Sequence, residues 1–170
     1  MTYIIAVVSF MLLLMVLWDA FEVIILPRRV THYIGFARVL IRSTWRLWSA
    51  VAQSMRDDQR RETYLSIFGP LYLLMLLSVW TTGLVSGFAT MHWGLGTPLN
   101  VAQGIAPLST YLYMSGTTLF TLGLGDVTPL GPVGRVLVAV EAGIGFGFLA
   151  AIISYLPILY QAFSRREVSI

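Results

Sequence analysis

The stretch that decides the fold is TLFTLGLGD, residues 118–126. Two glycines alternate there with two leucines, directly after the hydroxyl residue Thr121. Glycine adopts positive φ angles readily, so this alternation permits a ribbon whose successive backbone carbonyls point at one axis. Such carbonyls can replace the water around a bare cation. The ion-binding positions that we expect are Thr121, Leu122, Gly123, Leu124 and Gly125.

A short helix is expected immediately before this ribbon, over residues 109–120. The C-terminal end of a helix carries partial negative charge on its free carbonyls. A helix in this position would therefore direct its negative end at a dehydrated cation.

The pattern resembles the pore loop of tetrameric potassium channels, TxxTxGxGD followed by a proline and then an inner helix that opens with Gly-Arg. The matching residues are Thr118, Thr121, Gly123, Gly125, Asp126, Pro129, Gly134 and Arg135. The family most often has Tyr or Phe at the position of Leu124, although leucine also occurs there. The resemblance covers about residues 109–150. It implies a homotetramer with K⁺ as the permeant ion, bound at Thr121, Leu122, Gly123 and Leu124, and no other cofactor.

The resemblance also implies residues that support the filter, among them Thr118 and Asp126. Tyr113 and Met114 occupy the positions of the aromatic pair that usually braces the filter, and only the first is aromatic. Glu141 lies near the start of the last apolar segment. We expect it to hydrogen-bond behind the filter, with Thr117 or Tyr113 as its partner.

The composition is that of a membrane protein, with 57% hydrophobic and 11% charged residues and a mean hydropathy of +0.79. All basic residues are arginine, and most of them fall between Arg28 and Arg61. This concentration argues against nucleic acid as a partner. The chain lacks cysteine, and its two histidines are not at metal-ligand spacing. The sequence thus predicts neither a metal site built from side chains nor an enzyme.

Three apolar segments, residues 3–26, 65–90 and 133–163, are long enough to cross a bilayer. The first lacks a basic n-region and a cleavage site, so we interpret it as a retained helix. We therefore expect an all-α integral membrane fold with three transmembrane helices, a re-entrant pore helix and a filter loop. Residues 1–65 would form an N-terminal transmembrane helix with an amphipathic helix, and residues 66–170 the pore domain.

The arginine distribution predicts the topology, because basic residues favour the cytosolic side of a membrane. Arg28 to Arg61 and the Arg165-Arg166 pair would lie in the cytosol. The N-terminus of this multi-pass cell-membrane protein is then outside and the C-terminus cytosolic. This topology places residues 91–133 outside, where a pore loop has to enter.

Arginines recur every four residues along one face of the amphipathic segment 31–55, at Arg38, Arg42 and Arg46. A helix at the lipid headgroups, with anionic lipids as candidate partners, is the preferred interpretation. The alternative is a cytosolic helix packed on its own protein. Within the first apolar segment, Asp19 and Glu22 are costly in lipid unless they are paired, and we expect them to pair with Arg28 or Arg29.

The third apolar segment contains four positions at which a helix can bend, and they are the candidate gating hinges: Gly143, Gly145, Gly147 and Pro157. Gly143 and Gly147 also form a GxxxG pattern, which favours close helix packing. Packing and hinge roles both remain open at this point.

Three rival functions share parts of the pattern. Gly123 to Asp126 also spells the GxGD of intramembrane aspartyl proteases, for which Asp19 would be the second carboxylate. The topology predicted from the arginines would place Asp19 towards the cytosolic side of the membrane and Asp126 at the outer side. The two carboxylates of a catalytic dyad must lie close enough to share a proton. The others are a weakly selective or non-selective cation channel and a potassium-transporter subunit. The latter usually carries four pore repeats in one chain, and this sequence has one.

Overall fold

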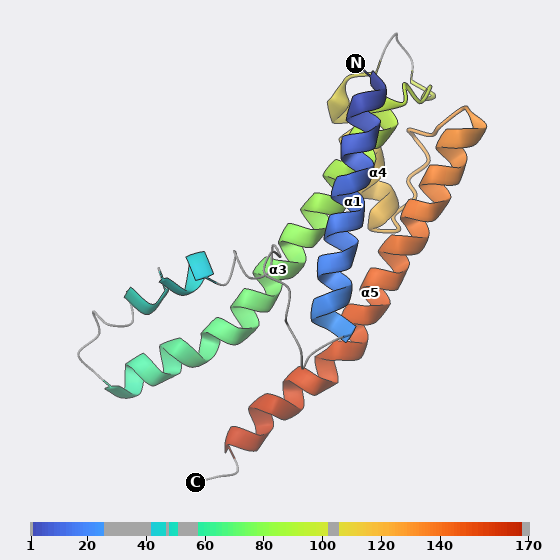
Figure 1. Ribbon diagram of the computed structural model, residues 1–170. Coiled ribbons are helices and arrows are strands. Elements are labelled where there is room, and N and C mark those ends of the chain that lie inside the picture. Colours follow the sequence, from blue (N-terminus) through green and yellow to red (C-terminus); the bar gives the residue numbers. More distant parts are fainter. Residues whose placement is uncertain (1, 26–41, 47, 51–57, 102–105, 168–170) are drawn as a thin grey trace. The chain divides into compact units, whose positions relative to one another are not determined.

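The computed structural model describes residues 2–25, 42–46, 48–50, 58–101 and 106–167. Its helices are α1 (Thr2–Ile25), α3 (Asp58–Gly94), α4 (Leu108–Leu119) and α5 (Pro132–Glu167), shown in Figure 1. No strand occurs among the described residues. Three stretches are long and apolar enough to span a membrane, namely Tyr3–Val23, Leu71–Gly94 and Pro132–Ser154. The predicted all-α membrane fold with three spans is confirmed.

Two of the helices extend beyond the predicted spans. Helix α3 begins at Asp58, so the charged residues 58–62 form its first turns. Its other end is fixed by Gly96, whose φ is +62°. The N–H of Thr97 bonds to the carbonyl of His92, and the N–H of Gly96 to that of Trp93. This is a Schellman cap, which satisfies carbonyls at the end of a helix and requires the left-handed conformation that glycine adopts.

The described chain forms two compact units, Met11–Leu84 and Met1–Phe10 with Val85–Ile170. In the first unit, α1 and α3 pack closely: a Cβ on Gly83 would lie 3.0 Å from Cγ2 of Val16. Asp19 is only 6% exposed and accepts a 2.8 Å hydrogen bond from Nε1 of Trp80. Arg28 and Arg29, the expected partners of Asp19, lie outside the described residues.

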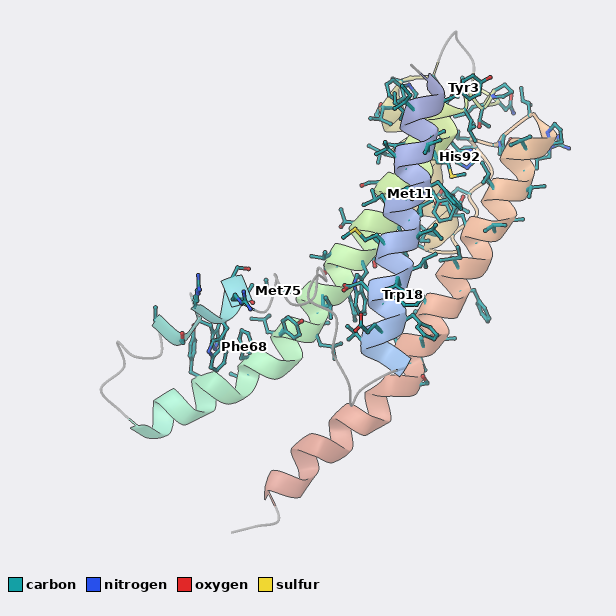
Figure 2. All side chains as sticks on the ribbon, viewed as in Figure 1. Tyr3, Met11, Trp18, Phe68, Met75 and His92 are labelled. Carbon is teal, nitrogen blue, oxygen red and sulfur yellow. The ribbon has the colours of Figure 1, made fainter. Side chains whose placement is uncertain are left out.

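An aromatic cluster in the same unit joins the helical residues 42–46 and 48–50 to the first half of α3. Trp45 meets Phe68 edge to face with ring centroids 4.9 Å apart, and Trp48 stacks on Tyr64 at 4.3 Å. Phe68 is labelled in Figure 2. This part of the amphipathic segment therefore packs on its own protein. The side chains of Arg42 and Arg46 are exposed, and contact with lipid headgroups stays a prediction for them. Arg38 lies outside the described residues.

Replacing Trp80 with phenylalanine should destabilise the protein, because it removes the buried hydrogen bond to the Asp19 carboxylate. Losing such a bond to a charged group costs about 1–3 kcal/mol. Thermal unfolding in detergent should show a lower melting temperature for Trp80→Phe. The matched control is Trp93→Phe, since Trp93 is 40% exposed. Equal melting temperatures for the two variants would contradict a stabilising role for the bond.

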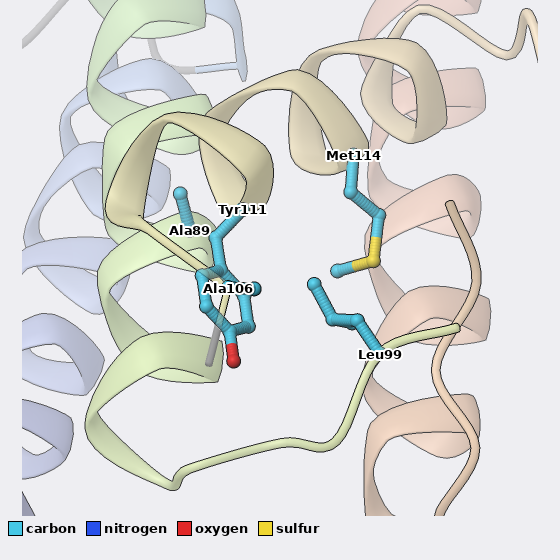
Figure 3. Close-up of a cluster of buried hydrophobic side chains, with 5 residues drawn as sticks. All are labelled: Ala89, Leu99, Ala106, Tyr111 and Met114. Carbon is cyan, nitrogen blue, oxygen red and sulfur yellow. The ribbon is translucent and has the colours of Figure 1, made fainter. Parts of the chain in front are cut away.

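The core of the second unit surrounds α4. Ala89 of α3, Leu99 and Ala106 of the following loop, and Tyr111 and Met114 of α4 form one buried cluster (Figure 3). The hydroxyl of Tyr111 donates a 2.8 Å hydrogen bond to the carbonyl of Thr97. The cluster holds α4 against the end of α3 and thereby positions the segment that follows α4.

Candidate functional site

Helix α4 ends deep within the span of α5. Gly145 is buried there, and a Cβ on it would overlap the carbonyl oxygen of Leu119 and lie 2.8 Å from the carbonyl carbon. Gly145 follows Pro132 by thirteen residues, which is ~20 Å along a helix. Leu119, the last residue of α4, therefore lies near the middle of the Pro132–Ser154 span. The chain enters the membrane region as a helix and must return from this depth to reach Pro132.

The returning segment, residues 121–126, has backbone conformations of alternating hand. The φ angles are +57° at Thr121, +53° at Gly123 and +77° at Gly125, whereas the two leucines between them are not in the positive region. Alternation of this kind gathers N–H groups on one side of a ribbon, and so turns the carbonyls to the other. The positive φ expected at both glycines is observed. Thr121 adopts it without being glycine, at a cost of about 1–3 kcal/mol.

The N–H side of this ribbon is attached to α4. The N–H groups of Leu122 and Gly123 both bond to the carbonyl of Thr117, at 2.8 and 3.3 Å, and that of Thr121 bonds to the carbonyl of Thr118 at 2.9 Å. Because the N–H groups point back at α4, the carbonyls of the ribbon are free to face away from it. Thr117 and Thr118, two of the expected supporting residues, thus contact the ribbon through their backbone carbonyls, and a supporting role in a filter stays a prediction.

The far end of the ribbon is tied to α4 by a side-chain bond. The hydroxyl of Tyr113 donates to Oδ2 of Asp126 at 2.8 Å. Tyr113 therefore braces the ribbon although its neighbour Met114 is buried in the core instead.

The loop after the ribbon is clamped to the loop after α3. Leu99 and Pro129 form an antiparallel bridge. The N–H of Asn100 bonds to the carbonyl of Thr128 at 2.8 Å, and the N–H of Leu130 bonds to the carbonyl of Pro98 at 2.9 Å. Both ends of the re-entrant segment are thus held at the same end of α5.

Gly134 allows α5 to start close to this clamp. A Cβ on Gly134 would overlap Cγ2 of Thr97 and lie 2.8 Å from Cβ of Pro129. The next residue, Arg135, donates from Nε to the carbonyl of Pro129 at 3.4 Å. Gly134 and Arg135 therefore pack the first turn of α5 against the loops that contain Thr97 and Pro129.

Glu141 is fully buried behind α4, and its partner differs from both residues expected. Its Oε1 is in hydrogen-bond contact with Oγ of Ser115. The hydroxyl of Thr117 instead donates to the carbonyl of Met114, and that of Tyr113 to Asp126. The predicted partners were wrong because the polar side chains of Tyr113, Ser115 and Thr117, which lie within about one turn of α4, point in different directions. Ser115, which was not among the expected partners, is the residue of α4 that contacts Glu141 of α5.

The candidate hinge residues of α5 fall into different environments. Gly145 packs against the backbone of Leu119, whereas Gly143 and Gly147 are exposed and a Cβ on either would meet nothing within 4 Å. Pro157 lies within the continuous helix α5, and its side chain lies outside the described residues. Gly145 therefore packs closely against the end of α4. Bending of α5 at any of the four candidate hinge residues stays a prediction.

His92 is a further buried residue near this site. It lies two residues before the end of the Leu71–Gly94 span and is fully buried, with Nδ1 3.3 Å from Oγ1 of Thr97.

The oxygen atoms of the backbone are the cation ligands that this site offers. Within the described ranges, no group of three or more His, Cys, Asp or Glu side chains is arranged to hold a metal ion. The exposed backbone of residues 121–126, by contrast, carries successive carbonyls on one ribbon. Successive carbonyl oxygens of this kind can replace the water around a cation.

Comparison with known proteins gives a family match and three relatives. A family model described as "Ion channel" matches residues 72–162, which is more than half of the chain and includes α4, the ribbon and most of α5. The chain is 31% identical over 122 residues to protein LctB of Bacillus caldotenax, covering 69% of this chain and 87% of that protein. The Geobacillus stearothermophilus LctB is 30% identical over 126 residues, 68% of this chain and 85% of that protein.

A third relative is the membrane protein YdjJ of Bacillus subtilis, 28% identical over 127 residues. The match covers 74% of this chain but only 36% of YdjJ, so the chain spans about a third of that protein's length. No solved structure matches the chain.

Proposed function

This chain belongs to the ion channel family, and from that premise we propose that it is a channel that conducts K⁺ passively and selectively across the cell membrane. Residues 121–126 are the selectivity filter of this proposal. The carbonyls of Thr121, Leu122, Gly123 and Leu124 and the Thr121 hydroxyl replace the water of the ion. Leu124 contributes its backbone in the same way as the more usual tyrosine would.

One observation carries the proposal: irregular, exposed backbone at the depth of a membrane span. The residues from Phe120 to Asp126 are exposed, and they rise from the level of Gly145 in the middle of the α5 span. Non-helical backbone cannot face lipid, because its polar groups would have no partners there. It is tolerated only where protein covers it or where it lines water. A pore formed by several copies of this segment satisfies both conditions.

We propose that four copies surround this pore as a homotetramer. One ribbon presents a single row of carbonyls, whereas a cage around an ion needs a ring of them. The native mass in detergent should correspond to four chains. A mass of one or two chains would contradict the proposal.

The orientation proposed for the channel follows from the arginines. The N-terminus is outside and the C-terminus is in the cytosol, so that the described loop residues 95–101, 106–107 and 127–131 lie at the outer mouth. The cytosolic arginines of residues 28–61 lie beside the inner leaflet, where anionic lipids are possible partners.

The experiment that tests selectivity is a reversal-potential measurement on purified protein in planar bilayers. With K⁺ on one side and Na⁺ on the other, the current should reverse close to the potassium equilibrium potential. Reversal near zero would favour the alternative of a weakly selective cation channel. Absence of current from a tetramer of correct mass would contradict the channel function itself.

A further inference from the structure

Ser115 of α4 lies between two other helices, and its single hydroxyl contacts an oxygen on each of them. Its Oγ is 3.0 Å from the carbonyl oxygen of Val85 in α3 and in hydrogen-bond contact with Oε1 of Glu141 in α5. Ser115 and Glu141 have no exposed surface. All three residues belong to the same compact unit. The hydroxyl therefore joins α3, α4 and α5 at one buried point.

Counting protons decides how these groups can bond. A serine hydroxyl carries one proton, a backbone carbonyl only accepts, and an ionised carboxylate also only accepts. If Glu141 were ionised, one proton would have to serve both Val85 and Glu141, and the other contact would bring two oxygen lone pairs together. If Glu141 carries a proton, its Oε1–H donates to Ser115, and Ser115 donates to Val85. Only the second arrangement makes both contacts hydrogen bonds.

The other carboxyl oxygen supports the same conclusion. Oε2 of Glu141 is buried and has no hydrogen-bond partner among the described residues. An unpaired oxygen of an ionised carboxylate is much more costly to bury than the carbonyl oxygen of a neutral acid. The Ser115 hydroxyl of α4 contacts the carboxyl, the Val85 carbonyl of α3 contacts that hydroxyl, and neither group is charged. On its own helix, Arg135 is exposed and donates to Pro129 instead.

We propose that Glu141 is held as a neutral carboxylic acid and is a positioning residue, whose proton fastens α5 through Ser115 of α4 to Val85 of α3. This relay fixes the helix whose last residues, Thr117 to Leu119, carry the ribbon. Its consequence for ion selectivity depends on the proposed channel function. The protonation itself does not depend on that function and is tested separately.

The first test is infrared difference spectroscopy of the full-length purified protein at neutral pH, parent minus Glu141→Gln. The difference should contain the carbonyl stretching band of a protonated carboxylic acid, which an ionised carboxylate lacks. Glu22→Gln, the same change at a half-buried glutamate of α1, controls for the loss of a glutamate as such. A difference made of carboxylate bands instead would overturn the proposal, whether or not the protein conducts.

The second test compares variants for potassium-over-sodium selectivity in bilayers. The side chain of glutamine has the length of glutamic acid and still carries a hydrogen-bond donor. Glu141→Gln should therefore retain the parent's permeability ratio within about twofold. Glu141→Ala and Ser115→Ala break the relay and should lower the ratio by roughly tenfold, since each leaves buried polar groups unsatisfied. Rescue by glutamine distinguishes positioning through the donor from filling of space. A Glu141→Ala channel as selective as the parent would refute the positioning role, whereas a parent without current would refute the channel function.

Discussion

Replacing Gly123 with alanine is expected to abolish potassium-selective current. Gly123 has a φ of +53°, and an L-residue in this left-handed region is destabilised by about 1–2 kcal/mol. In a four-fold ring the cost is repeated in every chain, about 4–8 kcal/mol in total. Since about 1.4 kcal/mol changes an equilibrium tenfold, this is enough to displace the filter conformation. Bilayer recordings of the purified variant should show either no current or a reversal potential near zero.

The effect has a specific physical cause, and the chain offers a control for it. No atom lies within 4 Å of a Cβ on Gly123, so the cost comes from the φ angle and not from crowding within the chain. Gly116 in α4 also has open space, but its φ is not positive. Alanine there should be neutral or stabilising by up to about 1 kcal/mol, because glycine is unfavourable within a helix. If Gly116→Ala and Gly123→Ala conduct alike, the role given to the left-handed glycine is wrong.

Alanine at Gly145 is expected to disrupt the base of the proposed filter and not merely the bending of α5. The added methyl group would overlap the carbonyl of Leu119, which is backbone and cannot rotate away. Overpacking of this kind typically costs about 1–3 kcal/mol per site. Gly145→Ala should therefore melt at a lower temperature and also lose potassium selectivity, because the displaced residue leads directly into the ribbon.

Two neighbouring glycines provide the comparison. Gly143 and Gly147 lie in the same stretch of α5, and alanine at either meets nothing within 4 Å in the chain. Both variants should keep the parent's melting temperature and ion preference. If Gly145→Ala changes only the open probability and leaves selectivity and stability alone, then a hinge role, as the sequence suggests, is correct and the packing role is not.

The parts of the fold that depend on local patterns were predictable. Hydropathy alone located the three spans, because an apolar run of this length is stable only as a helix across a membrane. The short helix before the ribbon was expected at residues 109–120 and is found at Leu108–Leu119. The positive φ angles of Gly123 and Gly125 also followed from the sequence, since glycine alone adopts them without penalty.

Contacts between distant residues were not predictable in the same way. The sequence put Glu141 behind the filter but named the wrong partner, because which hydroxyl of α4 faces α5 depends on how the two helices are rotated against each other. It likewise did not reveal that Trp80 donates to Asp19. Asp19 has candidate partners throughout the chain, and only packing selects among them.

The sequence by itself thus determined the membrane class, the number of spans and the position of the glycine-rich ribbon, because hydropathy, length and glycine placement act locally. The tertiary structure decided how deep that ribbon reaches, through the contact of Gly145 with Leu119. It also decided that Thr121 joins the glycines in the left-handed region, since the N–H bonds to α4 hold the ribbon there. These features arise from packing between residues far apart in the chain, where a side chain's surroundings and not its type set its role.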